Sequence, residues 1–481
     1  MDIRPSPLRT WSLTATLLSV AWLPQAVLVV ALVGAALVWR AEWLLLAPAV
    51  ALLAGPVRAA FGRGPLPGRA LRPADEPELA ALVRDVADRV GLRRPLLVRV
   101  VPDVQASLGP ARVDGTPSYV LLLGLPLLRT LTEAELASVV AHELAHEQQA
   151  RARGTALLGF ARELLAERLA GFLRPLAPLA APLLRASQPL VWRAELAADA
   201  QAARIAGGKA AMDALRRTAV LHAVYEGLGE AWWSALAEED AFPEDFYDAL
   251  DAALADPHVV ARAARTAAAD DAVDPYASAG HPPFARRIEA LADAPEAAGT
   301  YGTAPLPLRT SAALARWCVR ELAELEEVEV IDGEAARVRL LDLPDDRLHE
   351  LGGTPGLDLL LRVTGEELPV HALTAVLDAV ADGTGQQLAR RLEPGLRWLD
   401  AEARAALARE VLTGAGTTAL TAVLHAAGWT YAGRWLTSVL TAPDGRVVDL
   451  HALVGEAVDS GDTGPVRALL GPLADKEGAR A

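Results

Sequence analysis

Two histidines and a glutamate at metal-binding spacing stand in the first half of the chain. His142, Glu143 and His146 occur in the order His-Glu-x-x-His. On a helix the two histidines lie one turn apart on the same face, so their imidazoles can hold a single Zn²⁺. Glu143, beside them, can then act on a zinc-bound water. The spacing therefore predicts zinc-dependent hydrolysis, provided that the segment is helical and a third ligand exists.

The surrounding sequence predicts the helix that these residues need. Thr132 and Glu135 form a T-x-x-E capping box, which is typical of a helix N-terminus. Leu136 and Val139 follow at the spacing of an apolar helical face. We therefore expect one helix over about 131–148, with both histidines in its second half.

A third ligand must come from elsewhere, because a hydrolytic zinc takes three protein ligands and leaves one position for water. Glu195 and Asp199 stand four residues apart in the sequence E-L-A-A-D, within a segment of helical composition at 192–206. Glu195 is a candidate third ligand. Asp199, one turn further on, can orient a ligand histidine through its free ring N–H. Taken alone, the same spacing also fits two ordinary exposed carboxylates on a surface helix.

A short sheet is expected before the metal-binding helix. Segments 95–101 (PLLVRVV) and 118–123 (SYVLLL) are rich in strand formers, and Asp114-Gly115 marks a turn between them. Helical periodicity over 76–90 precedes both. Zinc peptidases commonly place an edge strand beside this kind of helix, so that an extended peptide can add to the sheet.

The N-terminus is strongly apolar. Residues 10–39 carry no charge, which suffices for one tilted membrane-spanning helix, and a shorter uncharged run covers 43–57. Arginines flank the pair on both sides, so the positive-inside rule places the rest of the chain in the cytoplasm. We expect a transmembrane hairpin over 1–63, in which the second run spans the bilayer or re-enters it. A cleaved signal peptide and a buried hairpin of a soluble domain are the alternatives.

A second apolar region, at 154–192, is interrupted by charged residues such as Arg162, Glu163 and Arg168. Because no charge-free window in it reaches bilayer length, we interpret it as an amphipathic insertion that lies on the membrane or covers the site. A helical hairpin packed inside the domain is the alternative.

Composition restricts the class of protein. The 481 residues carry a formal net charge of −15, which excludes a general nucleic-acid binder with a basic face. The single cysteine, Cys318, rules out an intramolecular disulfide and suits a reducing compartment. Abundant alanine and leucine favour a mainly helical protein.

Taken in order, the motifs resemble one family. H-E-x-x-H, then E-x-x-A-D, then H-P-P-x-x-x-R-I-x-x-L at 281–291, behind an apolar hairpin, are similar to the gluzincin family of HtpX-type membrane endopeptidases and CAAX prenyl proteases. The similarity covers about 64–292. Two features depart from it: the region at 154–192 is more charged than the paired spans of HtpX, and Gln105-Ala106-Ser107 stands where relatives tend to have asparagine and a small residue.

The resemblance implies a role for each residue of the first two motifs. His142, His146 and Glu195 would bind one Zn²⁺ per chain, and Glu143 would be the general base that acts on the zinc-activated water. Asp199 would support one of the ligand histidines. These roles make the protein a zinc metalloendopeptidase that hydrolyses polypeptides.

The resemblance also implies a substrate-facing pair and a location. His281 and Arg287, from the third motif, would be further catalytic residues facing the substrate or the developing oxyanion. The protein would be anchored in the lipid bilayer of a bacterial cell membrane with its catalytic domain in the cytoplasm. Quality control of membrane proteins would be its biological role.

The remainder of the chain has no such motif. From about residue 310 a helix at 312–325 and a later hairpin at 435–450 suggest a separate α+β accessory domain over 310–481, of unknown role. The expected fold is thus mainly α with a small β-sheet: a zincin-type metallopeptidase domain over 64–299 between the transmembrane hairpin and the accessory domain. The alternative function is a latent or inactive membrane-tethered scaffold or sensor whose C-terminal domain binds a partner.

Overall fold

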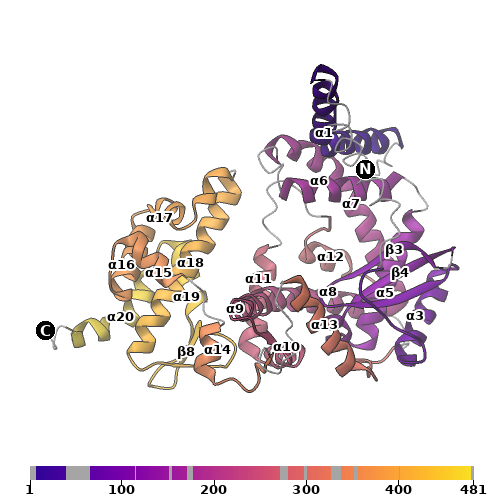
Figure 1. The fold of residues 1–481 in the computed structure, drawn as a ribbon. Helices are drawn as coiled ribbons and strands as arrows, with labels where there is room; N and C mark the ends of the chain where they lie inside the picture. Colours follow the sequence, from indigo (N-terminus) through magenta and orange to yellow (C-terminus); the bar gives the residue numbers. More distant parts are fainter. Residues whose placement is uncertain are drawn as a thin grey trace. The chain divides into compact units, whose positions relative to one another are not determined.

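The chain folds into two compact units (Figure 1). Unit 1 comprises Met1–Thr218 and Tyr276–Leu314, and unit 2 comprises Ala219–Pro275 and Ala315–Ala481. Both are mainly helical with small sheets, as the composition predicts. The computed structural model describes residues 7–39, 66–113, 115–150, 154–170, 177–270, 280–296, 301–326, 337–351, 356–399 and 401–477.

Unit 1 consists of a four-stranded sheet and the helices around it. Its strands are β1 (Arg69–Ala70), β2 (Leu96–Val101), β3 (Ala106–Val113) and β4 (Thr116–Gly124). Its helices, with α8 leading into unit 2, are α1 (Pro7–Trp39), α3 (Pro77–Val90), α4 (Leu125–Thr130), α5 (Glu133–Ala150), α6 (Gly154–Ala170), α7 (Ala177–Ala206), α8 (Gly208–Val224) and α12 (Phe284–Ala290).

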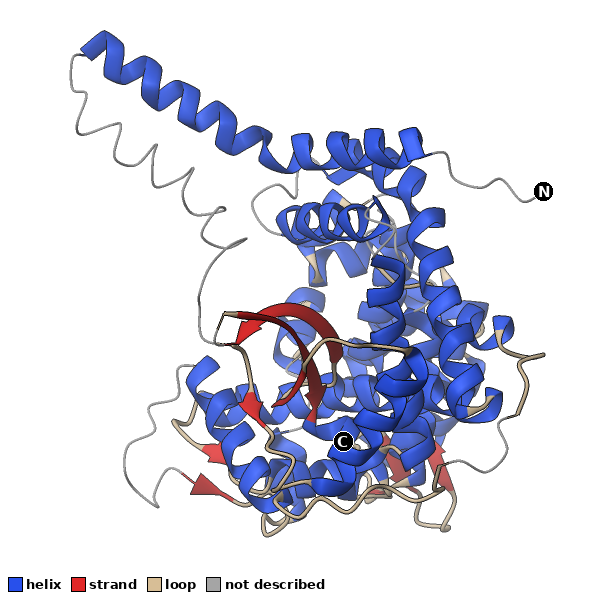
Figure 2. Ribbon diagram, turned by 90° about the vertical axis from the view of Figure 1, so that its right-hand side faces the viewer, coloured by secondary structure: helices blue, strands red, loops and turns tan. Residues whose placement is uncertain are grey.

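The sheet has the strand order β1-β2-β4-β3 and is strongly twisted (Figure 2). β2 and β4 are the two strands expected from the sequence, and they pair in parallel. β3 was not expected; it pairs antiparallel with β4 across the turn at Gly115 and ends the sheet. Gly109 and Pro110 lower its strand propensity, and a proline is tolerated there because an edge strand needs only one row of hydrogen bonds.

Helix α5 begins at the expected capping box. Thr132 Oγ1 accepts a hydrogen bond from the Glu135 N–H at 3.3 Å, and the Glu135 carboxylate accepts from the Thr132 N–H at 2.8 Å. Two further amides of the first turn, those of Glu133 and Ala134, donate to carbonyls of the segment 301–305. The start of α5 is therefore held both by its own cap and by a segment that returns late in the chain.

Helix α7 packs against α5 and is longer than the 15-residue helix expected at 192–206, since it begins at Ala177. Pro182 and Pro189 lie inside it without ending it. Near them the buried Arg162 of α6 donates hydrogen bonds to the Leu184 carbonyl and to the Ser187 hydroxyl. These bonds tie α6 to α7.

Helix α1 packs against α6 and α7 through an apolar cluster that includes Leu17 and Ala21. Arg168 of α6 donates to the Ala21 carbonyl and to Gln25 at 2.9 and 2.8 Å, and its guanidinium lies over the Trp22 ring. The described part of the region 154–192 therefore lies in α6 and the first half of α7, which pack on α1, and the amphipathic insertion expected there stays a prediction.

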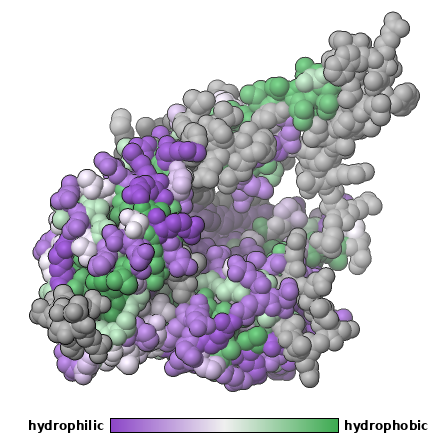
Figure 3. Space-filling view, turned by 60° about the vertical axis from the view of Figure 1, so that its left-hand side comes forward, coloured by the Kyte–Doolittle hydropathy of each residue, from purple (hydrophilic) through white to green (hydrophobic). Residues whose placement is uncertain are grey.

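Beyond this contact α1 exposes a mostly apolar surface. Leu23, Val27, Leu28 and Val30 are 46–71% exposed, and apolar surface is visible on the projecting segment in Figure 3. In the described part of the chain no single helix qualifies as a membrane span, but the pair 10–23 and 25–33, bent by 51° at Pro24, does so by length and composition. The second uncharged run, 43–57, lies outside the described residues, so the expected hairpin stays a prediction.

Unit 2 has its own core, made mainly by the helices after residue 356. The late hairpin expected at 435–450 is confirmed as β8 and β9, which pair antiparallel. The elements of unit 2, with α13 leading into it, are η2 (Tyr225–Glu230), α9 (Ala231–Ala237), β5 (Phe242–Pro243), α10 (Phe246–Leu254), α11 (Pro257–Asp270), α13 (Ser311–Leu325), β6 (Arg337–Val338), α14 (Asp345–Leu351), α15 (Leu357–Thr364), α16 (Pro369–Ala381), α17 (Gly385–Leu392), η4 (Pro394–Trp398), α18 (Ala401–Ala426), β7 (Thr430–Tyr431), β8 (Val439–Thr441), β9 (Val447–Asp449), α19 (Leu450–Ser460) and α20 (Gly464–Glu477).

Candidate metal centre

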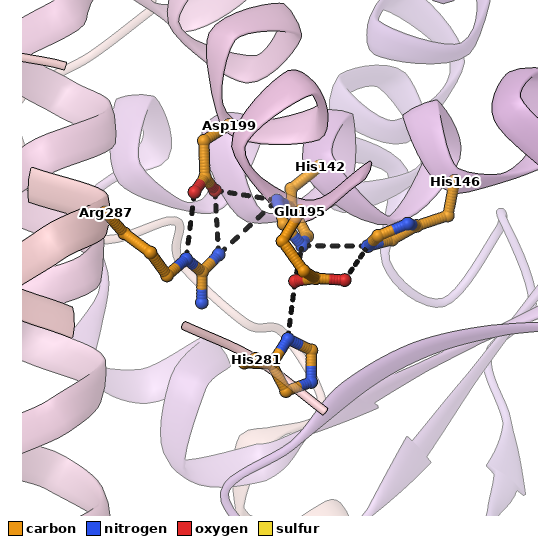
Figure 4. A network of polar contacts seen from close by, with 6 residues as sticks. All are labelled: His142, His146, Glu195, Asp199, His281 and Arg287. Carbon is orange, nitrogen blue, oxygen red and sulfur yellow. Dashed lines mark hydrogen bonds and ion pairs between the residues drawn. The ribbon is translucent and has the colours of Figure 1, made fainter. Parts of the chain in front are cut away.

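Helices α5 and α7 bring two imidazoles and a carboxylate together (Figure 4). The Nε2 atoms of His142 and His146 are 3.0 Å apart. The Glu195 carboxylate lies 3.6 Å from His142 Nε2 through one oxygen and 3.2 Å from His146 Nε2 through the other. In the described part of the chain this is the only group of three or more His, Cys, Asp or Glu side chains that converge closely enough for one metal ion.

The three side chains fit a zinc ion. Zinc binds histidine nitrogen and carboxylate oxygen at about 2.0–2.2 Å in a tetrahedral arrangement, which places neighbouring ligand atoms about 3.4 Å apart. The observed separations of 3.0, 3.2 and 3.6 Å bracket this value. Two imidazoles and one carboxylate also form a ligand set that leaves one position open, as hydrolytic zinc sites require. The donor set and its spacing therefore suit catalytic zinc.

A buried ion pair stands behind His142. Asp199 Oδ1 lies 2.9 Å from His142 Nδ1, the ring nitrogen that faces away from the cluster. Arg287 of α12 holds the same carboxylate with two hydrogen bonds, of 2.9 Å from Nε and 2.7 Å from a terminal nitrogen. Both side chains are less than 10% exposed. The pair fixes the orientation of the His142 ring, because a carboxylate on Nδ1 directs Nε2 toward the cluster.

His281 lies on the open side of the cluster. Its Nδ1 contacts the Glu195 carboxylate, while its side chain is 64% exposed. It belongs to the loop just before α12, so one segment supplies both His281 and Arg287. The structure thus brings the third motif to the other two, with the histidine facing outward and the arginine buried.

The electrostatics of the cluster favour a negative Glu195. Burial alone would raise the pKa of its carboxyl, but hydrogen bonds with His142 and His281 hold that pKa well below its usual range. Burial would likewise lower the pKa of His142, yet its contacts with Asp199 and Glu195 outweigh this and raise the pKa to about 9. A metal that binds His142 at neutral pH must therefore displace a proton.

The other two groups of the H-E-x-x-H motif are shifted toward their neutral forms. Burial, reinforced by the nearby charge of His142, lowers the pKa of His146 to about 4, so this imidazole is a ready neutral ligand. Burial also raises the pKa of the Glu143 carboxyl. A raised pKa brings Glu143 closer to the range in which a carboxylate exchanges protons efficiently at neutral pH.

The site residues named from the sequence thus meet in one place, but one is placed differently from the expectation. Arg287 was expected to face the substrate, whereas its guanidinium is buried against Asp199. Sequence reasoning also missed the edge strand β3, against which α5 packs. The eight residues between Gln105 and the Asp114-Gly115 pair have the length of a strand. Gly109 and Pro110, which have low strand propensity, obscured this signal in the sequence.

Comparison with known proteins agrees with this geometry. Residues 73–294 match the model of peptidase family M48, and the matched range contains all the residues of the cluster. No solved structure matches the chain significantly.

Proposed function

Because residues 73–294 match peptidase family M48, a family of zinc metalloendopeptidases, we propose that the chain hydrolyses polypeptides at the cluster formed by α5 and α7. The observation that carries the proposal is the convergence of His142, His146 and Glu195 at the separations of ligands on one zinc ion. Zinc bound there supplies a Lewis acid that lowers the pKa of water toward neutrality and polarises a carbonyl.

Glu143 is the general base in this proposal. It follows His142 directly in the chain, and burial raises the pKa of its carboxyl. Its carboxylate takes a proton from the attacking water and later delivers a proton to the leaving amine of the cleaved peptide bond. A base that works in both directions needs a pKa above that of a free carboxyl, and the burial of Glu143 supports that requirement.

The remaining residues hold the reactants in place. His281 is exposed beside Glu195, so its second ring nitrogen can donate to the carbonyl oxygen on which negative charge develops. Arg287 acts through Asp199 and is a positioning residue, since its guanidinium donates two hydrogen bonds to the Asp199 carboxylate. Asp199 in turn keeps Nε2 of His142 directed at the metal.

The substrate binds as an extended chain along β3. This strand ends the sheet, and α5 packs against it, so a polypeptide added at that edge would pass the metal-binding helix. A short extended segment of an unfolded or loosely folded protein is therefore the substrate class that fits the site.

We further propose that the protein is attached to a membrane. The exposed apolar surface of α1 and the bent pair at 10–33 support attachment to a bilayer. With arginines on both flanks of the apolar region, the catalytic unit would lie on the cytoplasmic side. An anchored peptidase of this kind would act on membrane proteins that have lost their fold, which is a quality-control role.

The decisive test replaces the general base. In Glu143→Gln the carboxylate is lost while the three metal ligands remain, so zinc content should stay at that of the wild type while cleavage of β-casein falls by at least a hundredfold. Zinc is measured by inductively coupled plasma mass spectrometry, and cleavage by the release of new peptides.

Glu163 is an exposed carboxylate of α6. Glu163→Gln makes the same chemical change away from the cluster, so it is the matched control and should cleave like the wild type. Wild-type cleavage rates in the zinc-loaded Glu143→Gln protein would refute the mechanism. A zinc-free, inactive wild-type protein that does not take up added zinc would refute the function.

A further inference from the structure

One row of backbone groups on β3 points away from the sheet, and its direction is fixed by two hydrogen bonds. The Gly124 N–H donates to the Gln105 carbonyl, so position 105 and every second residue after it along β3 face β4. The Tyr119 N–H donates instead to the Pro95 carbonyl at the start of β2, as the same alternation along β4 requires. The two bonds therefore give one consistent pattern for the whole strand pair.

The alternation assigns four residues of β3 to the open edge: Ala106, Leu108, Pro110 and Arg112. Three of them offer both an amide N–H and a carbonyl. Pro110 has a carbonyl but no N–H. A polypeptide paired along this edge would thus meet a backbone acceptor at all four positions. It would meet no backbone donor at Pro110, so the substrate carbonyl opposite Pro110 would lack a hydrogen bond.

The position without an amide donor, Pro110, lies on a strand that packs against the metal-binding helix. Pro110 is the cross-strand partner of Tyr119. Helix α5, which carries the H-E-x-x-H motif, packs against β3. The open edge around Pro110 therefore belongs to the strand on which the metal-binding helix packs.

We propose that Pro110 is a specificity-determining residue: it ends the backbone pairing between β3 and the substrate, so that productive pairing is limited to the stretch opposite Ala106 and Leu108. The proposal rests on the proposed peptidase function and on substrate binding along this edge. It gives the enzyme a preference for short extended segments over long β-strands. A chain able to form a long strand would gain nothing from the residues that lie beyond the proline.

A simpler role for the same residue is protection of an exposed edge. A proline on an edge strand hinders pairing between two copies of a protein, whether or not the edge binds a substrate. The two roles differ in what they predict. Edge protection affects self-association alone, whereas the proposed role changes how the rate of cleavage depends on substrate length.

The test compares the effect of substrate length in four forms of the full-length, zinc-loaded protein: the wild type, two variants of Pro110 and one control variant. Cleavage sites in β-casein are mapped by mass spectrometry, and quenched fluorescent peptides are built from the best site and extended one residue at a time at either end. In the wild type, kcat/KM should stop rising at a fixed length on one side. Pro110→Ala restores an amide donor, so the ratio of kcat/KM for the longest to the shortest peptide should rise about two- to tenfold, the effect of one hydrogen bond.

Pro117→Ala is the matched control, because Pro117 is an exposed proline of β4 whose backbone faces the β2 side. Its ratio should equal that of the wild type. Pro110→Val restores the same amide in a good strand former and is measured alongside in case the alanine variant folds poorly. Circular dichroism checks folding, and sedimentation checks self-association at the assay concentration.

An unchanged length dependence in both Pro110 variants would overturn the proposal, with or without new self-association. The same change in Pro117→Ala would overturn it as well. These results leave the peptidase function standing, since all forms would still cleave. Absence of Glu143-dependent cleavage in the wild type would instead overturn the peptidase function, and this inference with it.

Discussion

At the scale of single residues, the candidate metal centre includes a carboxylate, Asp199, that lies outside the cluster of His142, His146 and Glu195. Asp199 is bound on one side by Arg287 and on the other by His142 Nδ1. Both neighbours are buried, so the His142 ring has no alternative partner in water. The buried Asp199–Arg287 ion pair therefore holds the His142 imidazole in one orientation.

Replacing this carboxylate should weaken metal binding without removing a ligand. In Asp199→Asn the shape is kept, but the charge that holds Arg287 and His142 is lost, so zinc affinity should fall about 10- to 100-fold. Competition with a chromophoric chelator measures the affinity. Asp213→Asn removes a carboxylate of α8 that pairs with Lys209 on the surface, and it should bind zinc like the wild type. Equal affinities in Asp199→Asn and the wild type would contradict the role of Asp199.

At the scale of elements, α5 is positioned by its first turn. The capping box satisfies two amides, and the segment 301–305 satisfies two more, so the helix start is fully bonded within unit 1. Downstream, Ala137, Val140, Ala141 and Leu144 are completely buried along one face. The helix is thus fixed along the face opposite its histidines, so that both imidazoles point toward α7.

Removing the cap should therefore loosen α5 locally. Thr132→Ala deletes the hydroxyl that accepts the Glu135 amide, at a cost of about 1 kcal/mol. Hydrogen–deuterium exchange of peptides from the first turn of α5 should become several-fold faster, with little change in unit 2. Thr132→Ser keeps the hydroxyl and should exchange like the wild type. Unaltered exchange in the alanine variant would show that the returning segment alone holds the helix start.

At the scale of the whole chain, α1 links an apolar surface to the catalytic unit. One part of α1 is held by Arg168 and an apolar cluster on α6 and α7, and another part exposes Leu23, Val27, Leu28 and Val30. Because α7 also carries Glu195, the element that would meet the membrane rests on a helix of the metal site.

Charges on the exposed part should detach the protein from membranes. Val27 and Val30 are 60% and 71% exposed, and each aspartate in a bilayer core costs about 3 kcal/mol. The double variant Val27→Asp/Val30→Asp should therefore move from the vesicle fraction to the soluble fraction in flotation through a density gradient. Val27→Leu/Val30→Leu keeps the surface apolar and should float like the wild type. A charged variant that still floats fully would argue against membrane insertion of this segment.

The local features of the site were predictable because they depend on neighbours in the chain. The capping box, the one-turn spacing of His142 and His146, and the strands β2 and β4 follow from hydrogen-bonding and side-chain periodicity over a few residues. The motif order then pointed to a zinc peptidase, and the match of residues 73–294 to peptidase family M48 agrees with it.

Features made by distant residues needed the folded chain. The E-L-A-A-D spacing was compatible with a surface helix, and only the packing of α7 on α5 places Glu195 at the histidines and buries Asp199. The pairing of Arg287 with Asp199 joins residues 88 positions apart. Strand β3 has a sequence unfavourable for a strand and forms because β4 supplies a complete set of hydrogen bonds on one side. Sequence patterns record local preferences, whereas the partner of a carboxylate or of an edge strand is chosen by packing.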